Sequence, residues 1–359
     1  MINKAELTAE WINRVSKESR NADKILVEKV IRAMLLIEGL LKEEIEFVLK
    51  GGTSLIFLLK SAKRLSIDVD INIHHKLPVI NDKFTEIVNE QGFTRFERQE
   101  RSTNTKIEKS HYKFFYKPLH KSNTEEEYIL LDILYEQINY INIKSIPLAS
   151  TFTPNSGRPL KVKIPSTEDI LGDKLTAFAP RTTGIPYQKG EVSMSMEIIK
   201  QLYDIGSLFD EVKDLSIIKS TFSKFVITEV DYIGKTTLTE NDVLNDIYET
   251  SLSISTRGSF GKESFEKLQT GIQRIRNFIF SESYQIEKAI VDSSKAAYLA
   301  TLIKYKSGNI EKYTEGSVKK EWIVNEPLNT KLNILKRSNI EAFFYWYKVY
   351  ELTIAGKGI

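Results

Sequence analysis

The residue types and spacing with the clearest chemical meaning lie at positions 66–73 of the 359-residue sequence. Isoleucine and valine alternate there with polar residues, which predicts a strand with one apolar face and with Asp68 and Asp70 together on the other. The two carboxylates are then about 6–7 Å apart along the strand. Hard oxygen ligands at this spacing can hold Mg²⁺ ions that bridge a nucleoside triphosphate, activate an attacking oxygen and stabilise the leaving pyrophosphate.

A solvated polar face on a half-buried strand is the common explanation for an isolated Asp-x-Asp pattern. Two features of this segment favour a metal site. The opposite face is uniformly Ile or Val, which anchors the strand in a core. Two like charges on one face also repel each other unless a cation or solvent compensates them.

A second pattern, Lys-Gly-Gly-Thr-Ser-Leu at positions 50–55, has the composition of a phosphate-binding turn. Gly51 and Gly52 allow a positive φ and a close approach of the backbone to a phosphate. The apolar run that follows predicts a helix, whose first N–H groups, together with the hydroxyls of Thr53 and Ser54, are donors for an anion. The alternative is an ordinary glycine turn followed by a Ser or Thr helix cap.

The elements that must position these residues are predicted from hydrophobic periodicity. Residues 1–45 read as helices, with one buried face along 21–41, where Asn21 or Asp23 is a candidate cap. Strands are expected at 46–50, 66–73, 111–116, 128–136 and 160–164, and a short helix before residue 91. Helices return over 166–178 and 193–209, separated by a loop at 182–190, and continue to the C-terminus (265–280, 283–306 and 339–352). The fold class predicted is α+β, with a mixed or antiparallel sheet flanked by helices in residues 1–165 and a mostly α-helical domain in residues 166–359.

The two patterns together, Gly-Gly-Thr-Ser-Leu followed by Arg-x-Ser-x-Asp-x-Asp, resemble the AbiEii/AbiGii-type nucleotidyltransferase family of the polymerase-β-like superfamily. The resemblance covers roughly residues 45–210 and implies a polymerase-β-like core that uses Mg²⁺ and a nucleoside triphosphate. It implies that Asp68 and Asp70 bind metal. It also implies that the residues of the glycine turn and of the Arg-x-Ser pattern bind the nucleotide: Gly51, Gly52, Thr53, Ser54, Arg64 and Ser66.

A third carboxylate, Asp132, lies in the otherwise apolar strand predicted at 128–136. A buried carboxylate needs a cation, a hydrogen-bond donor or an exit to solvent. In the superfamily that the chain resembles, a third acidic residue on a neighbouring strand serves as metal ligand or general base. The alternative is a structural partner for Lys or Arg, and Glu136, on the same strand face, is a lesser candidate for the chemistry.

Two later segments resemble the family's downstream motifs, which places active-site helices in residues 166–210. Lys174 in Glu-Asp-Ile-Leu-Gly-Asp-Lys-Leu-Thr-Ala is implied to neutralise the triphosphate, although its spacing alone favours a solvated lysine. Lys200 is implied to bind nucleotide and Asp204 to be catalytic; they lie four residues apart, where the alternative is a surface ion pair. The family often has an acidic residue where this chain has Gln201.

Composition narrows the function further. The chain has no cysteine, which excludes disulfides and thiolate chemistry, and only four histidines. A net charge of +3 gives little support for a nucleic-acid partner. Neither a signal peptide nor a membrane helix is predicted, so a cytoplasmic protein without a membrane partner is expected. The aromatic clusters at 114–116 and 343–347 could stack on RNA bases, but their spacing favours core packing.

These observations and the resemblance predict an Mg²⁺-dependent nucleotidyltransferase toxin of a bacterial toxin–antitoxin or phage-defence system. It is expected to transfer NMP from NTP to an acceptor, by resemblance the 3′ end of tRNA, and to be restrained by a cognate antitoxin. One alternative is transfer of NMP or phosphate to a protein hydroxyl. The other is a non-catalytic interaction protein built on a decayed transferase fold.

Overall fold

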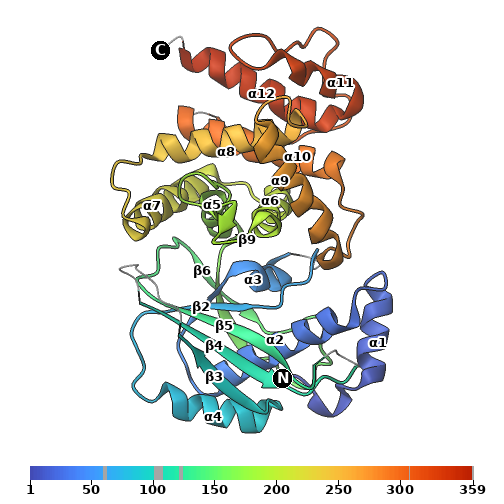
Figure 1. Ribbon diagram of the computed structural model, residues 1–359, viewed down its shortest axis with the longest axis vertical. Coiled ribbons are helices and arrows are strands. Elements are labelled where there is room, and N and C mark those ends of the chain that lie inside the picture. Colours follow the sequence, from blue (N-terminus) through green and yellow to red (C-terminus); the bar gives the residue numbers. More distant parts are fainter. Residues whose placement is uncertain (60–62, 101–107, 121–123, 307, 358–359) are drawn as a thin grey trace. The chain divides into compact units, whose positions relative to one another are not determined.

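The computed structural model describes residues 1–59, 63–100, 108–120, 124–306 and 308–357 of the chain (Figure 1). The chain forms two compact units. The first contains Met1–Ser166 and Asn277–Ser283, and the second contains Thr167–Arg276 and Tyr284–Ile359. The sequence-based division at residue 165 did not anticipate that a short segment from the C-terminal half joins the first unit.

The first unit is built around a five-stranded sheet in the order β1-β2-β5-β4-β3. Only β2 and β5 of these five strands are parallel to each other; the other neighbours are antiparallel. The sheet is therefore mixed, as the sequence predicted, and the α+β class is confirmed. The strands are β1 (Val48–Lys50), β2 (Val69–Ile73), β3 (Arg95–Gln99), β4 (Glu108–Tyr116) and β5 (Glu127–Tyr135), and a separate hairpin pairs β6 (Ile143–Pro147) with β7 (Lys161–Pro165).

One face of this sheet is apolar and covered by helices. The helices of the unit are α1 (Ala9–Glu18), α2 (Lys24–Lys42), α3 (Gly51–Leu58) and α4 (Ile80–Gln91), with a 3₁₀ turn η1 (Lys4–Glu6). Phe84 of α4 packs edge-on against Tyr112 and Phe114 of β4. The opposite face, called the polar face below, carries the alternate residues of each strand, Asp70 and Asp132 among them.

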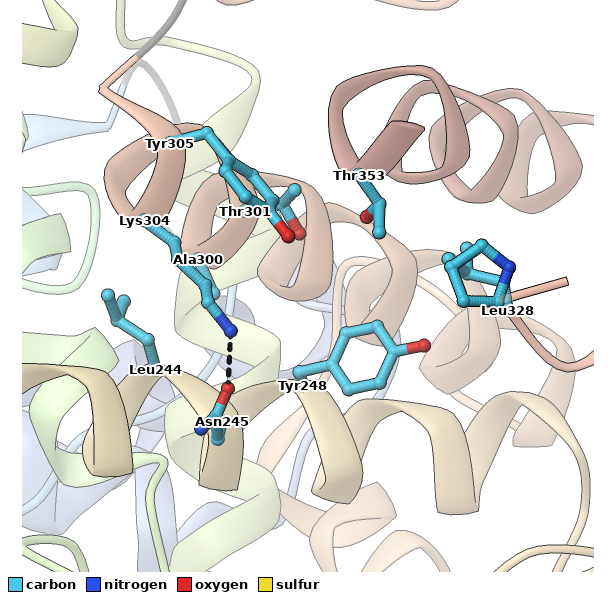
Figure 2. A pocket seen from close by; sticks show the side chains of 10 residues that line it. Leu244, Asn245, Tyr248, Ala300, Thr301, Lys304, Tyr305, Leu328 and Thr353 are labelled. Carbon is cyan, nitrogen blue, oxygen red and sulfur yellow. Dashed lines mark hydrogen bonds between the residues drawn. The ribbon is translucent and has the colours of Figure 1, made fainter. Parts of the chain in front are cut away.

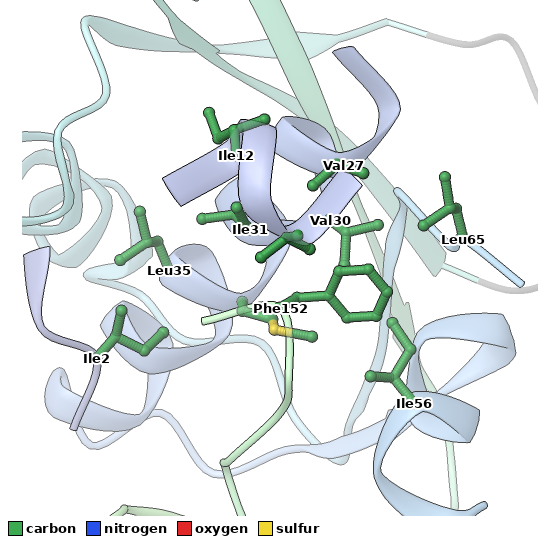
Figure 3. Close-up of a cluster of buried hydrophobic side chains, with 11 residues drawn as sticks. Ile2, Ile12, Val27, Val30, Ile31, Leu35, Ile56, Leu65 and Phe152 are labelled. Carbon is green, nitrogen blue, oxygen red and sulfur yellow. The ribbon is translucent and has the colours of Figure 1, made fainter. Parts of the chain in front are cut away.

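A cluster of buried side chains fixes α3 and the segment before β2 to the N-terminal helices (Figure 3). Val27, Val30 and Ile31 of α2 form its centre, and Asp23 caps the start of this helix with its carboxylate. Ile56 of α3 belongs to the same cluster, as does Leu65. Core packing therefore positions both halves of the sequence motif. The other members of the cluster are Ile2, Ile12, Val15, Met34, Leu35 and Phe152.

The segment Asn277–Ser283 pairs with the chain just before the Asp-bearing strand. The Leu65 N–H donates to the Phe278 carbonyl at 2.7 Å, and Arg64 and Ile279 form an isolated antiparallel bridge. Phe280 packs edge-on against Phe152 of the hydrophobic cluster. Asn277–Ser283 follows more than a hundred residues of the second unit in the chain, and its backbone holds the motif of the first unit in place.

The second unit is helical apart from a short hairpin of β8 (Gln188–Lys189) and β9 (Val192–Ser193). Its central helix, α10 (Ile286–Tyr305), is buried over most of its length and contacts α6, α8 and α12. The predicted α-helical C-terminal region is confirmed. The other helices are α5 (Thr167–Ala177), α6 (Ser195–Phe209), α7 (Leu215–Ile233), α8 (Glu240–Ser255), α9 (Lys262–Arg274), α11 (Leu335–Ser338) and α12 (Ile340–Lys357), with the 3₁₀ turn η3 (Thr330–Ile334). A further 3₁₀ turn, η2 (Ile275–Phe278), begins in this unit and ends in the segment that belongs to the first.

Among the described residues, no helix is both long enough and apolar enough to cross a membrane. The predicted core role of the aromatic cluster near the C-terminus is confirmed for Phe343–Trp346, which are buried. At 114–116 the prediction holds for Phe114 and Tyr116 only. Phe115 lies on the polar face because side chains alternate along a strand.

Candidate active site

The glycine turn joins β1 directly to α3. Lys50 is the N-cap of α3, and its ammonium group has no acceptor for the first N–H groups of the helix, which are donors of the kind that bind anions. Gly51 has a φ of +69°, which L-residues with a side chain rarely adopt. A Cβ at this position would also lie 2.0 Å from Oδ2 of Asp70. Glycine is therefore required here both for the turn and for the close approach of an aspartate.

Gly52 leaves room for the arginine of the motif. A Cβ on Gly52 would lie 2.4 Å from Nη2 of Arg64 and 2.7 Å from Oγ of Ser66. Arg64 is buried, and its Nη1 donates to the carbonyl of Leu65 at 3.1 Å. The guanidinium thus lies against the N-terminus of α3, and both contribute positive potential at the same turn.

The two hydroxyl residues of the turn are fully buried, and other protein groups already bond to them. Ser54 Oγ donates to the Gly51 carbonyl at 2.7 Å. Thr53 Oγ1 donates to the Asp68 carbonyl and lies 3.1 Å from Ser66 Oγ. These bonds fix the turn to the start of β2. The direct role of Thr53 and Ser54 in nucleotide binding stays a prediction.

The carboxylates meet through strand pairing. Asp70 and Asp132 are register partners in the parallel pair β2–β5, where neighbouring strands lie about 4.8 Å apart. Lys50 is the partner of Asp70 on β1, so the row begins beside the glycine turn. On the other side His111 of β4 is the partner of Asp132, and Nδ1 of this histidine lies 2.7 Å from Oδ1 of the carboxylate. Asp68 is half-exposed and lies just before β2, which begins at Val69 and not at residue 66 as predicted, so strand pairing does not fix its place in the row.

His111 was not identified as a site residue from the sequence. Its strand was predicted, and alternation with the buried Tyr112 could have assigned it to the polar face. Its pairing with Asp132 depends on register, which the sequence does not give. Glu136, the lesser candidate for the chemistry, accepts a hydrogen bond from Nδ2 of the buried Asn72 at 3.1 Å.

The donor set fits Mg²⁺ held jointly with phosphate oxygens. Asp68, Asp70 and Asp132 offer the carboxylate oxygens that this ion prefers. Across the described part of the chain, no three His, Asp or Glu side chains are grouped closely enough to enclose a metal by themselves. Magnesium in nucleotide sites usually has one or two carboxylate ligands and completes its shell with water and phosphate. Two adjacent carboxylates beside a helix N-terminus match that arrangement.

Gly51→Ala is expected to displace the Asp70 carboxylate. A residue with a Cβ in the left-handed region costs about 1–2 kcal/mol of stability, and the new methyl group would overlap Oδ2 of Asp70. Gly157→Ala is the matched control, because Gly157 also has a positive φ but no heavy atom within 4 Å of the place that a Cβ would take. Both variants should lower the melting temperature, Gly51→Ala by the larger amount because it adds the overlap with Asp70 to the backbone cost. Only Gly51→Ala should lose Mn²⁺ binding in electron paramagnetic resonance titrations; equal Mn²⁺ affinities would contradict the steric argument.

The remaining predicted site residues lie in the second unit. Lys174 of α5 is 6% exposed, which contradicts the solvated position that its spacing alone favours. Its Nζ lies 2.9 Å from Oδ2 of the buried Asp204 on α6 and donates to Oε1 of Gln201 at 2.8 Å. Gln201 thus contacts the lysine at the position where the family often has an acid. Lys200 pairs with Glu197, one turn earlier on α6, at 3.0 Å.

A separate cavity of about 250 Å³ lies between α8 and α10 in the same unit (Figure 2). A hydrogen bond between two of its lining residues joins Lys304 Nζ to Oδ1 of Asn245 at 2.8 Å. The ring of Tyr248 forms one wall, and burial raises the pKa of its hydroxyl to about 12. None of the predicted site residues lines this cavity.

Comparison with known proteins agrees with the sequence motifs. The chain resembles the crystal structure of JHP933 from Helicobacter pylori, with 17% identity and a TM-score of 0.42, over 81% of this chain and 94% of that one. It also resembles MenT4, a nucleotidyltransferase toxin from Mycobacterium tuberculosis H37Rv, with 15% identity and a TM-score of 0.43, over 78% and 97%. No curated protein matches the chain. Residues 36–245, more than half of the sequence, match the family described as nucleotidyl transferase AbiEii toxin, type IV toxin–antitoxin system, and the chain belongs to that family.

Proposed function

We propose that the protein is an Mg²⁺-dependent enzyme that transfers a nucleoside monophosphate from an NTP to the 3′ end of tRNA. It would act in the bacterial cytoplasm, within a toxin–antitoxin or phage-defence system, under the control of a cognate antitoxin. The observation that carries the proposal is the row Lys50–Asp70–Asp132, which places two carboxylates beside the N-terminus of α3. An anionic triphosphate and a divalent cation are the ligands that such a combination favours.

The reaction uses these groups in distinct ways. The acceptor oxygen attacks the α-phosphorus, a new P–O bond forms, and the bond to the β-phosphate oxygen breaks so that pyrophosphate leaves with the electron pair. The N-terminus of α3 and Arg64 bind the triphosphate, and Asp68 and Asp70 bind the metal. Bound Mg²⁺ would supply Lewis-acid stabilisation of the negative charge that develops. The hydroxyl proton passes to Oδ2 of Asp132, or to solvent where Asp132 serves as a metal ligand. The contributions of Lys174, Lys200 and Asp204 stay predictions from the family motifs.

The experiment is transfer of α-³²P from each of the four NTPs into total tRNA in the presence of Mg²⁺. Wild-type protein is compared with Asp68→Ala, which removes one carboxylate of the pair. Label that enters tRNA only with the wild type supports the proposal, and the preferred NTP identifies the base. Label found on protein would indicate that the acceptor is a protein hydroxyl. Transfer of label from a γ-³²P NTP to the acceptor would indicate a kinase. An absence of label everywhere would favour the non-catalytic interaction protein.

His111→Phe is expected to lower kcat with little change in the KM for NTP. An ionised carboxylate only accepts hydrogen bonds, so Nδ1 of His111 is the donor to Asp132. Phenylalanine keeps the ring but removes this donor, and the loss of one charge-assisted bond costs about 1.5–3 kcal/mol, or roughly 10- to 150-fold in rate. His111→Asn, which keeps an N–H group, should recover part of the loss. His74→Phe, in an exposed turn, is the control and should behave as wild type.

A further inference from the structure

The polar face of the sheet continues beyond the carboxylates into a group of aromatic and basic side chains. Phe115 of β4 is the register partner of Tyr128 on β5 and of Arg95 on β3. Lys113 lies two residues before Phe115 and therefore on the same face. These four residues (Arg95, Lys113, Phe115 and Tyr128) are called the aromatic–cation cluster. In Figure 1 their strands β3, β4 and β5 run side by side, in agreement with the sheet order.

Contacts within the cluster hold planar groups against one another. The Arg95 guanidinium lies 3.6 Å from the ring centre of Phe115, and Nζ of Lys113 lies 4.3 Å from the ring centre of Tyr128. The two rings are 5.9 Å apart. Arg95 also pairs with Glu126 at 3.0 Å and with Glu97 of the same strand, which restrains its orientation over the ring.

The aromatic–cation cluster is exposed to solvent even though its side chains contact one another. Tyr128 is 37% exposed, and the side chain of Arg95 is 44% exposed. Aromatic side chains on a strand are usually buried in the core, as Phe114 and Tyr116 are in this sheet. An exposed ring on the same face as the site residues is therefore a candidate for ligand contact.

The spacing along the strands relates the cluster to the carboxylates. Tyr128 precedes Asp132 by four residues on β5, and Phe115 follows His111 by four residues on β4. At about 3.3 Å per residue the separation is about 13 Å. Across the sheet the cluster lies beyond Asp132 from the glycine turn, because β4 and β3 follow β5 while β1 lies beyond β2. Along the strands it is displaced toward the end at which Asp68 precedes β2.

We propose that the aromatic–cation cluster binds the nucleotides that precede the terminal hydroxyl of a single-stranded polynucleotide acceptor. The inference rests on the proposed function, whose triphosphate occupies the glycine turn and leaves this side of the carboxylates for the acceptor. Bases stack on aromatic rings and on guanidinium planes, and lysines bind the phosphates between them. Exposed cation–π contacts are weak, so Lys113 can leave the Tyr128 ring for a phosphate.

The chemistry of the cluster predicts the kind of specificity. Ring faces and cations contact any base and any phosphate, so affinity should depend on single-strandedness and salt concentration more than on sequence. Lys113 supplies the positive charge for a polynucleotide, because Glu97 and Glu126 already compensate the charge of Arg95. An acidic peptide is the other class of ligand that this charge would accept, and the experiment includes it.

The test measures binding of the full chain without NTP to a fluorescent single-stranded RNA of about 12 nucleotides, a length within the range of such sites. Fluorescence anisotropy is recorded for wild type, Tyr128→Ala, Tyr128→Phe and Lys113→Glu. Tyr128→Ala should weaken binding about 5- to 150-fold, the loss expected for one stacked base, whereas Tyr128→Phe should bind as wild type. Lys113→Glu should weaken binding and reduce the slope of log Kd against log salt by about one. Lys161→Glu, an exposed lysine on β7, makes the same charge change outside the cluster and should have little effect.

The outcomes separate this inference from the proposed function. If wild-type protein labels tRNA but Tyr128→Ala leaves RNA affinity and the KM for RNA unchanged, the cluster is not the acceptor site and the chemistry stands. If the variants weaken RNA binding while no transfer to RNA is detected, the binding site stands and the acceptor reaction is wrong. Preferential binding of a poly-glutamate peptide over RNA would overturn the inference. Melting temperatures within 2 °C or so of wild type would show that the variants fold.

Discussion

Asp70→Asn is expected to reduce nucleotide transfer by about a thousandfold without unfolding the protein. The substitution keeps the shape of the side chain but removes the charge of a carboxylate that lies beside Asp132 and the first residue of α3. Metal stabilisation of charge in the transition state contributes several kcal/mol, and about 4 kcal/mol corresponds to a factor of about 10³ in rate. The rate is measured as single-turnover incorporation of α-³²P from NTP into the acceptor.

A second measurement separates loss of metal from loss of structure. Asp70→Asn should weaken Mn²⁺ binding in the presence of a non-hydrolysable nucleotide. Its melting temperature should stay close to that of wild type, because the removed repulsion with Asp132 opposes the lost attraction to the N-terminus of α3. Asp82→Asn makes the same substitution at an exposed position of α4 and serves as the control. Retention of more than a tenth of the wild-type rate by Asp70→Asn would exclude this carboxylate as an essential ligand.

Lys295→Met is expected to destabilise the second unit by about 3 kcal/mol, the lower end of the range for breaking a buried ion pair. Nζ of Lys295 lies 2.8 Å from Asp210 at the end of α6 and 3.3 Å from Glu341 of α12. It also lies over the ring of Phe209 at 5.5 Å. This one cation therefore joins three helices, and its removal leaves their carboxylates without compensation. The lower end applies because Asp210 is 59% exposed and can be hydrated.

The stability contribution of Lys295 has a defined pH dependence. Burial lowers the pKa of this lysine, but Asp210, Asp292 and Glu341 raise it, and the net pKa is above its ordinary value of 10.5. A raised pKa of a basic group means that the contribution is fully present below pH 10.5 and is lost as the pH rises through the higher folded-state value. At neutral pH Lys295→Met should melt about 6–12 °C below wild type, since 1 kcal/mol of stability corresponds to about 2–4 °C in melting temperature for a unit of this length.

The control for this prediction is Lys267→Met. Lys267 pairs with Glu263 one turn away on α9, and the side chain of Glu263 is 85% exposed. Exposed pairs of this kind contribute a few tenths of a kcal/mol at most. Calorimetry at pH 7 should therefore separate the two variants clearly, and equal melting temperatures would show that the buried position of Lys295 has no energetic consequence.

The sequence predicted the strands with a strong hydrophobic pattern and missed those without it. β2 was identified because apolar residues occur at every second position, and β5 because of its nearly continuous apolar run. β3 reads Arg-Phe-Glu-Arg-Gln and exposes most of its residues at the edge of the sheet, so it carries almost no hydrophobic pattern. β6 is also largely exposed. Such edge strands are held by backbone pairing with a neighbour, and that pairing is not encoded in their own composition.

The candidate site was predictable in its parts but not in its assembly. Local spacing identified Asp68 and Asp70. Asp132 was identified because a carboxylate in an otherwise apolar strand is costly to bury. The register that makes Asp132 the neighbour of Asp70 and of His111 joins residues that are 62 and 21 positions apart in the chain. The burial of Lys174 likewise depends on Asp204 of another helix, a contact that spacing within α5 cannot indicate.

The return of Asn277–Ser283 to the first unit has a consequence for synthesis of the protein. Proteins are made from the N-terminus and their domains generally fold as units during translation. The ribosome must translate past Ser283 before Leu65 and Arg64 can gain their backbone partners at Phe278 and Ile279. A nascent or prematurely terminated chain of 276 residues therefore carries the glycine turn and both aspartates without this brace. The order of synthesis thus delays the bracing of the segment at Arg64 and Leu65 until most of the second unit has been made.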